Sequence, residues 1–418
     1  MRNDSTTSAK VKEQIARFNQ KLSDGLSRPV KKFFGQMLFG IQAGRDVKLS
    51  NIARNLNEPI KLIKTENRLS RNISKSDYSE QINQVLIQDG QKRIGADTVL
   101  CFDLTDVNKP FAKKMENLSE TWDGSKGCHG QGYWISSVVA AEVKGETVTP
   151  LYSGLYSSAA DDFVSENDEI LKAIRQVNGQ LKGRGIWAID RGGDRHILVD
   201  EMMRMGLHFV IRAKINHLVS VAGKEPEHLE TFIQKIKYTK KMELVINREG
   251  CDEKHEILFG SVSKVMISGH LVTLVVIKGF GEKPMILMTN VNKSAREILE
   301  IYLTRWKCEE SFRFLKQEYH LEDVRVRKYI GLRNMVAFVN AVYYFLSVYL
   351  GQRAKMNILF RKLLVKARRF FETSVFKQYA LADGIYWLLF NTTWDPKQDD
   401  APKPVNQLEL NFWPEPSP

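Results

Sequence analysis

Four residues with chemically active side chains recur at helical spacing late in the chain: Tyr302, Arg305, Glu309 and Lys316. Their segment, YLTRWKCEESFRFLK, contains neither Gly nor Pro and is rich in Leu, Arg, Lys and Glu, so it predicts an α-helix. At about 100° per residue the four side chains share one narrow face. A carboxylate between two cations and a phenol suits a site where the acid holds a metal ion and its neighbours hold a phosphate backbone. The same pattern also fits a solvated face with two salt bridges.

A second candidate acid lies inside an apolar strand. Residues 98–105, TVLCFDLT, read as a strand that is apolar apart from its threonines and Asp103. A carboxylate in such a strand costs on the order of several kcal/mol unless it is paired or bound to a metal ion. Asp103 is therefore the first expected metal ligand. Asp106 is the competing acid, and its side chain would leave the opposite face of a continued strand.

A third acid ends another apolar strand, residues 185–190, GIWAID. The carboxyl ends of strands are where open α/β sheets bind ligands, so Asp190 is the second expected metal ligand. Asp194, four residues later, is expected to cap the helix that runs through residues 197–205. The glycines of this turn form neither G-x-G-x-x-G nor a Walker loop, so they do not indicate a nucleotide site.

These motifs resemble the insertion sequence four family of bacterial transposases. The four residues of the late helix match the Y-R-E-K signature of that family, and DRGGDR, which starts at Asp190, resembles its second-Asp motif. Family members carry the first Asp in a strand with Thr shortly after it, as Asp103 does here. The resemblance covers roughly residues 50–350.

The resemblance implies a metal-dependent DNA transposase. Its expected catalytic residues and metal ligands are Asp103, Asp190 and Glu309. Its expected contacts to element-end DNA are Tyr302, Arg305 and Lys316. Carboxylate oxygens suit Mg²⁺, with Mn²⁺ possible, and a pair of such ions would activate the attacking oxygen and steady the leaving one.

The elements that must position these residues follow a recognisable order. Strands are predicted at residues 98–105, 132–141, 147–155, 185–190 and 207–213, with a helix at 165–177. This order resembles the opening of a ribonuclease-H-like domain, although simple meanders also start this way. Glu309 follows Asp190 by 119 positions, and the interval contains further predicted strands, at 242–246, 255–259, 271–277 and 284–288. The resemblance therefore implies a mostly β insertion before the late helix.

The first quarter of the chain predicts several short helices. Residues 49–56 resemble the first helix of a helix-turn-helix, 57–59 its turn and 60–69 its second helix. Lys61, Lys64 and Arg68 lie three and four residues apart, so they are expected to share a DNA-binding face. A basic helical bundle that mediates protein contacts is the alternative interpretation.

The composition supports a polyanionic partner. The chain has 418 residues, a net charge of +13 and a pI near 9.4, and much of the excess lies in residues 1–95 and 353–378. The four cysteines show neither C-x-x-C spacing nor an accompanying His pattern, which argues against a zinc site or disulfides and fits a reducing cytoplasm. The uncharged stretch 334–352 is expected to be a buried amphipathic helix rather than a membrane span.

We therefore predict an α/β chain whose ribonuclease-H-like mixed sheet is flanked by helices. The predicted divisions are a helical DNA-binding domain (1–95), the first part of the core (96–215), a β-rich insertion (216–291), the last part of the core (292–350) and a basic helix with a Pro-rich tail (351–418). The predicted function is cleavage and strand transfer of double-stranded DNA, with a homodimer in the synaptic complex. A ribonuclease-H-like nuclease, or an inactive DNA-binding protein derived from a transposase, is the alternative.

Overall fold

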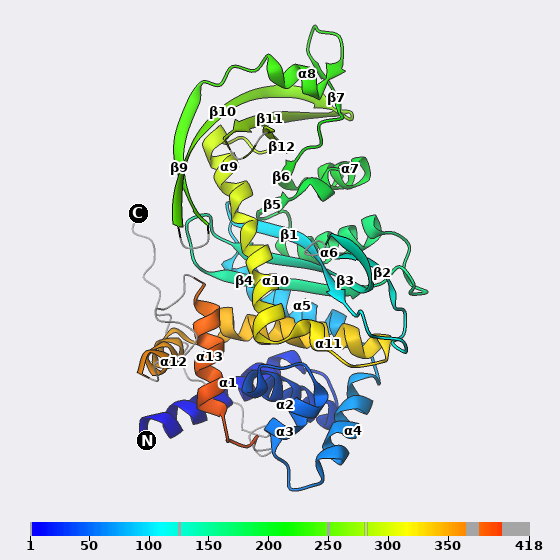
Figure 1. The fold of residues 1–418 in the computed structure, drawn as a ribbon, viewed down its shortest axis with the longest axis vertical. Helices are drawn as coiled ribbons and strands as arrows, with labels where there is room; N and C mark the ends of the chain where they lie inside the picture. Colours follow the sequence, from blue (N-terminus) through cyan, green and yellow to red (C-terminus); the bar gives the residue numbers. More distant parts are fainter. Residues whose placement is uncertain are drawn as a thin grey trace.

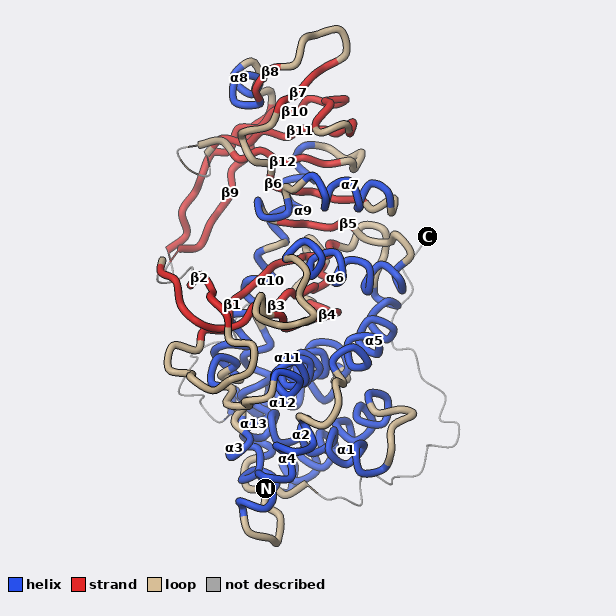
Figure 2. Tube along the Cα trace, turned by 90° about the vertical axis from the view of Figure 1, so that its right-hand side faces the viewer, coloured by secondary structure: helices blue, strands red, loops and turns tan. Residues whose placement is uncertain are grey.

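The structure is a computed structural model that describes residues 2–123, 127–248, 251–279, 281, 283–364 and 376–394. A large sheet occupies its middle and upper part, and helices from both ends of the chain gather below the sheet (Figure 1). The turned view shows the same two parts, the strands with several helices beside them above and a bundle of helices below (Figure 2). The predicted mixed α/β class is confirmed.

Helices alone build the first quarter of the described chain. They are α1 (Arg2–Leu22), α2 (Arg28–Gly44), α3 (Leu49–Leu56), α4 (Leu62–Ile73) and α5 (Ser79–Gly90), followed by the 3₁₀ turn η1 (Gln91–Arg93). α3 coincides with the predicted helix, and it ends where Asn57 adopts a left-handed φ of 46°. α4 begins two residues later than predicted and continues to Ile73. Residues 33–43 of α2 are buried, so this helix forms the centre of the lower bundle.

A mixed sheet of 12 strands crosses the rest of the molecule. The strands are β1 (Val99–Asn108), β2 (Ser119–Asp123), β3 (Cys128–Ala141), β4 (Val148–Tyr156), β5 (Ile186–Ile189), β6 (His208–Arg212), β7 (Leu218–Val221), β8 (Glu227–His228), β9 (Lys240–Arg248), β10 (Cys251–Ile267), β11 (His270–Lys278) and β12 (Met285–Thr289). Their order is β2-β3-β1-β5-β6-β12-β11-β10-β7-β8, with β4 on β3 and β9 on β10. β1, β5 and β6 are parallel neighbours; the pairing of β1 with β5 ends at Cys101 and Ala188, and β1 then continues to Asn108.

Alternate side chains of the central strands point to opposite faces of the sheet, and different helices pack on each face. Leu100 and Trp187 pack against α6 (Glu166–Leu181) and α7 (His196–Arg204). Cys101 and Ala188 belong to the opposite core, which includes side chains of α9 (Ala295–Thr304), α10 (Trp306–Glu318) and α11 (Tyr329–Tyr344). The period of two in the strands thus produces three layers, helix, sheet and helix.

Residues 216–291 extend this sheet. β12 pairs antiparallel with β6, so the strands predicted for the insertion continue the hydrogen-bonded lattice of the first part. Four of them match predicted strands, whereas β7, β8 and the short helix α8 (Leu229–Gln234) were not predicted. β2, which ends with Thr121, Trp122 and Asp123 opposite β3, was not predicted either.

The uncharged segment forms a buried helix as predicted. α11 is buried along nearly its whole length and passes into a π-helical turn, η4 (Phe345–Tyr349). Within the described residues no single helix is long and apolar enough to span a membrane; one pair, 329–349 with 352–362, passes that test together but is bent by 101°. α12 (Gln352–Leu364) and α13 (Lys377–Leu389) follow. The end of the predicted basic helix and the Pro-rich tail from residue 395 lie outside the described residues.

Candidate active site

Asp103 lies on the face of β1 that looks toward α10. Val99 and Cys101 belong to the core on that side, and Asp103 is the next residue of the same alternation. A groove of about 360 Å³ runs here between β1 and α10. Its lining residues are Asp103, Leu104, Thr105, Glu309, Phe312, Arg313, Lys316 and Gln317. We call this hollow the site groove.

Asp190 lies at the end of β5, beside Asp103. Cys101 of β1 pairs with Ala188 of β5 in the parallel register, and the two aspartates stand two residues beyond this pair. Asp190 caps the 3₁₀ turn η2 (Arg191–Gly193) by accepting a hydrogen bond from the Gly192 amide at 2.8 Å. The predicted pair of aspartates on adjacent strands is therefore present.

Glu309 comes to the groove on a helix that is interrupted at Arg305. The predicted continuous helix is two helices, α9 and α10, joined by tight turns in which the Arg305 amide donates to the Tyr302 carbonyl and the Cys308 amide donates to the Arg305 carbonyl. Thr304 donates its hydroxyl back to the Glu300 carbonyl at 2.8 Å, a contact that bends helices. The buried Cys101 thiol donates to the Thr304 carbonyl at 3.4 Å, so a group of β1 satisfies the interrupted helix.

Arg305 joins two of the three acids. Its Nη1 donates to Asp103 Oδ2 at 2.6 Å and its Nη2 donates to Glu309 Oε1. The Arg305 side chain is only 14% exposed, whereas that of Glu309 is 54% exposed. The guanidinium therefore points inward between the carboxylates rather than outward toward solvent.

Burial sets the protonation chemistry of this cluster. It raises the pKa of Asp103 to about 7, the carboxylates of Asp190 and Glu309 add to the rise, and Arg305 and the Leu104 amide oppose it. Burial acts to lower the pKa of Arg305, but the charges of Asp103 and Glu309 outweigh it and raise that pKa above its ordinary value. Near neutral pH Asp103 thus lies close to the midpoint of its titration, beside a fully charged guanidinium.

The two thiols beside the cluster do not add to its chemistry. Cys101 and Cys308 are fully buried, and burial raises the pKa of Cys101 to about 12 and that of Cys308 well above its ordinary value. Both remain thiols at neutral pH, so neither is a nucleophile or an anionic metal ligand there.

The donor set suits a hard cation, although the side chains are not gathered around one. Three carboxylates supply only oxygen ligands, the type that Mg²⁺ and Mn²⁺ prefer. In the described part of the chain, however, no group of three or more His, Cys, Asp or Glu side chains is placed to hold a metal ion. The Arg305 guanidinium stands between Asp103 and Glu309, so cation binding by all three acids requires it to move.

Two other residues of the predicted helical face lie nearby in different surroundings. Lys316 lines the site groove and pairs with Glu322 at 2.9 Å and with Asp106 at 3.4 Å. Asp106, the competing acid, is therefore engaged by a lysine. Tyr302 is buried in the core, with its ring 5.9 Å from the Arg305 guanidinium. The Tyr302 ring therefore packs beside Arg305, and its phenol is not exposed to solvent.

The predicted basic face of the N-terminal helices lies away from the site groove. Lys61 precedes α4, so only Lys64 and Arg68 lie within the helix. Arg68 pairs with Glu58 at 2.6 Å, whereas Lys61 and Lys64 are exposed. α4 belongs to the lower bundle, separated from the sheet by α11 (Figure 1).

Sequence reasoning missed some groove residues and misplaced one acid. Arg313 and Gln317 follow Glu309 by four and eight residues, so the helical spacing already contained the signal for them. Asp194 was predicted to cap α7, and this is wrong because Arg195 occupies that position. Asp194 is buried and accepts hydrogen bonds from the Lys214 amide and from His217, which requires tertiary contacts that the sequence does not display.

Comparison with known proteins identifies the family. A family model described as a transposase DDE domain matches residues 94–345, more than half of the chain, and this span includes all three candidate acids. A solved structure of a piggyBac transposase synaptic complex with hairpin DNA is similar at 10% identity and a TM-score of 0.36, with 83% of this chain and 59% of that chain covered. The chain thus spans less than two thirds of the length of that relative. No curated protein matches. The chain belongs to the transposase DDE domain family.

Proposed function

We propose that this chain is the DNA transposase of a bacterial insertion sequence, of the Y-R-E-K type, with a ribonuclease-H-like core. The observation that carries the proposal is that Asp103 and Asp190 both stand two residues beyond the last pair of the parallel strands β1 and β5, with Glu309 on the same groove as Asp103. The reaction would be cleavage of double-stranded DNA at the element ends followed by strand transfer. Both steps need an activated oxygen nucleophile and a stabilised leaving oxygen.

Asp103, Asp190 and Glu309 are the proposed ligands of Mg²⁺, or of Mn²⁺ in its place. Bound there, the metal would act as a Lewis acid on the scissile phosphate and lower the pKa of a bound water. Other residues of the chain would position the DNA. Lys316 and Arg305 would contact the DNA backbone as they exchange their carboxylate partners for phosphate, and Tyr302 would orient Arg305.

The proposed partners follow from this reaction. Element ends and target are double-stranded DNA, and Lys61, Lys64 and Arg68 of the N-terminal helices are proposed as further contacts to it. Synapsis of two ends suggests a homodimer on DNA in the cytoplasm. The net charge of +13 agrees with a polyanionic substrate.

One observation favours a second candidate, a DNA-binding protein that has lost catalysis. Arg305 neutralises two of the acids within the chain itself, and the described residues form no metal cluster. Such a protein would bind element ends without cutting them. A ribonuclease-H-like nuclease would cut them without joining the products.

The test is an excision assay on supercoiled plasmid that carries this gene with its native flanks. The purified protein is incubated with Mg²⁺, wild type beside Glu309→Gln. Excised and joined products with the wild type alone support the transposase, and cut products without joining support the nuclease. If both proteins bind the flanks and neither cuts them, the binding protein is the correct interpretation.

A further inference from the structure

A second groove, of about 310 Å³, lies between the N-terminal helices and the segment that follows α10. We call that segment, residues 320–328, the strap, and the hollow beside it the strap groove. One wall comes from α3 and α4 and the other from the strap, so the groove joins parts of the chain that are some 260 residues apart in sequence. It contains none of the three candidate acids.

The strap presents two arginines to this groove. Val324 and Val326 are buried and Arg325 and Arg327 are exposed, the alternation of an extended chain. Among the residues that the structure describes, neither guanidinium group has a hydrogen bond or an ion pair. Two charged forks, each with five donors, are therefore available to a ligand.

The other lining residues are of the kind that contacts phosphate. Lys48 and Lys328 add positive charge, Glu66 is the single acid of the lining, and Ser50, Asn67, Ser70 and Ser74 add neutral polar groups. Lys328 is paired with Glu116 at 2.5 Å and Lys48 with Asp323 at 2.5 Å. Arg, Lys, Ser and Asn side chains are among the groups that contact the DNA backbone in protein–DNA complexes.

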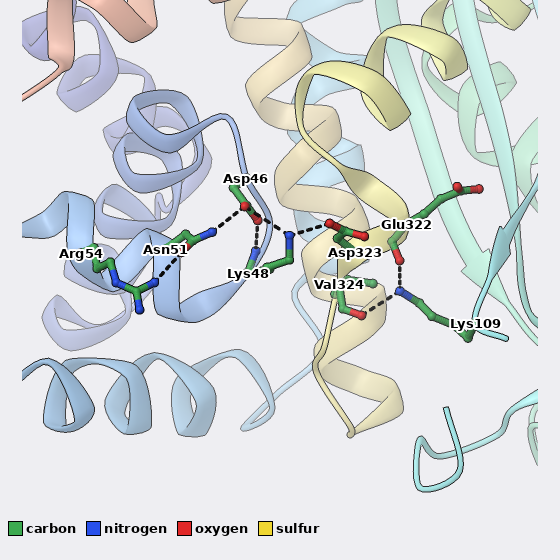
Figure 3. A network of polar contacts seen from close by, with 8 residues as sticks. All are labelled: Asp46, Lys48, Asn51, Arg54, Lys109, Glu322, Asp323 and Val324. Atoms are coloured by element: carbon green, nitrogen blue, oxygen red, sulfur yellow. Dashed lines mark hydrogen bonds and ion pairs between the residues drawn. The ribbon is translucent and has the colours of Figure 1, made fainter. Parts of the chain in front are cut away.

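Polar contacts hold the strap in place between the bundle and the sheet (Figure 3). Lys48 joins Asp46 to Asp323, and the buried Lys109 amine donates to the carbonyls of Glu322 and Val324. Asp46 also accepts from Asn51 of α3 at 2.6 Å. The strap is thus anchored from both sides.

The bundle wall is fixed as firmly at its other end. Asn334 of α11 is fully buried and donates to the Ile73 and Ser76 carbonyls, each at 2.7 Å. At Gly331 any side chain would meet Val326 and Ser74, because a Cβ atom there would lie within 3 Å of both. A groove that is already fixed loses little conformational entropy when a ligand binds.

The strap links the strap groove to the site groove. The strap begins two residues after α10 ends, and Lys316 of the site groove pairs with Glu322 of the strap. From Glu309 to the end of α10 the helix rises on the order of 15 Å. A duplex whose end occupies the site groove would therefore have further phosphates near the strap.

We propose that the strap groove binds the sugar-phosphate backbone of double-stranded DNA, through Arg325 and Arg327, on the same duplex whose end lies in the site groove. The inference rests on the proposed function for the identity of that duplex. It assigns a second, non-catalytic contact that holds the DNA while the site acts.

The test measures binding of a fluorescent duplex carrying the element end, as a function of salt, by anisotropy. Arg325→Gln/Arg327→Gln is compared with wild type. Loss of two phosphate contacts should weaken binding at physiological salt about tenfold or more and reduce the slope of log affinity against log salt by about 2. Arg325→Lys/Arg327→Lys keeps the charge and should restore most of the slope.

Lys224→Gln/Lys237→Gln is the matched control, because it removes the same charge from exposed lysines around α8, at the opposite end of the molecule (Figure 1). This control should bind like wild type. Unchanged affinity and slope in the arginine variant, or an equal loss in the control, overturns the proposal. Stronger competition by single-stranded RNA or an acidic protein than by duplex DNA overturns the choice of partner.

The excision assay separates this proposal from the proposed function. If the wild type cuts and joins the plasmid and the arginine variant binds the duplex as well as the wild type does, only the proposal for the strap groove is wrong. If the wild type binds the duplex through these arginines and never cuts it, the proposal for the strap groove stands and the proposed transposase function is wrong. Thermal melting of each variant confirms that the exposed substitutions leave the fold intact.

Discussion

The site groove and the strap groove treat positive charge in opposite ways. In the site groove the cations form ion pairs with acids of the same chain. Arg305 pairs with Asp103 and Glu309, and Lys316 pairs with Asp106 and Glu322. In the strap groove Arg325 and Arg327 have no such partners among the described residues. The contrast shows that local pairing, rather than the total of +13, decides where a polyanion finds open contacts.

The strongest way to sharpen this contrast is to remove an acid from the site groove. Asp103→Asn should lower cleavage about a thousandfold or more, because the charge of a proposed metal ligand is lost. Affinity for the duplex should stay within about twofold, since the strap groove is unchanged. Plasmid cleavage and duplex anisotropy measure the two effects separately.

Asp106→Asn is the matched control, since Asp106 lies on the same strand and pairs with Lys316. It should change cleavage by no more than a few fold. If Asp106→Asn abolishes cleavage and Asp103→Asn does not, the assignment of the first acid is wrong.

A second change breaks the internal pairing. Arg305→Gln should cost about 3 kcal/mol of unfolding free energy at pH 8, because it leaves a buried carboxylate without its partner. The pKa of Asp103 is raised to about 7 in the folded chain, so its contribution to stability is full below its unfolded value and is lost as the pH rises through about 7. The deficit of the variant should therefore shrink between pH 8 and pH 5, where Asp103 takes up a proton.

Urea denaturation at the two pH values measures that change. Arg296→Gln is the control on α9, because Arg296 is largely exposed and pairs with Glu300 at the surface. It should cost less than about 0.5 kcal/mol at either pH. A deficit of Arg305→Gln that grows on acidification would contradict the role given to Asp103.

The sequence predicted the acids better than their surroundings. Asp103 and Asp190 were recognisable because each is a charge in an apolar strand, and the parallel register then brings them together. The inward turn of Arg305 depends on the helix break after Thr304, which a residue of β1 helps to satisfy. Such a contact between distant segments has no local sequence signal.

The strap groove was beyond sequence reasoning for the same reason. Lys48 and Arg325 line the same groove because α11 holds the bundle against the sheet, and neither lies in a recognisable motif. Four strands of the predicted insertion are present, but nothing in its sequence indicated that β12 would pair with β6. Periodicity predicts elements, whereas pairing partners far apart in the chain require the assembled fold.

A third prediction concerns the anchor of the strap. Burial lowers the pKa of Lys109 to about 8, so the unfolded chain holds this proton more tightly and the stability due to Lys109 rises with pH above 8. Between pH 7.5 and 9.5 wild type should gain about 2 kcal/mol relative to Lys109→Met. Guanidinium denaturation across this range measures the gain.

Lys113→Met, at an exposed lysine of the same connection, should show no such dependence. A flat or falling difference for Lys109→Met would mean that the strap is not anchored by a buried amine.

The smallest expected effect is the difference in duplex affinity between removing a paired cation and removing an unpaired cation of the strap groove. Lys328→Gln should weaken duplex binding by less than about threefold, because Lys328 is already paired with Glu116. Arg325→Gln alone should weaken it more and reduce the salt slope by about 1. Anisotropy titrations of the two single variants at several salt concentrations decide this. Equal losses of affinity in the two variants would show that ion pairing within the chain does not decide which cations bind DNA.

The pairing of β12 with β6 constrains how this chain can be shortened. Removing residues 216–291 would leave β6 as an open edge, a row of unpaired amides and carbonyls that recruits strands from other molecules and leads to aggregation. Strands can be given up only from the β7–β8 rim inward, because each loss there exposes an edge farther from β1 and β5. A viable truncation therefore has to begin at the rim farthest from Asp103 and Asp190.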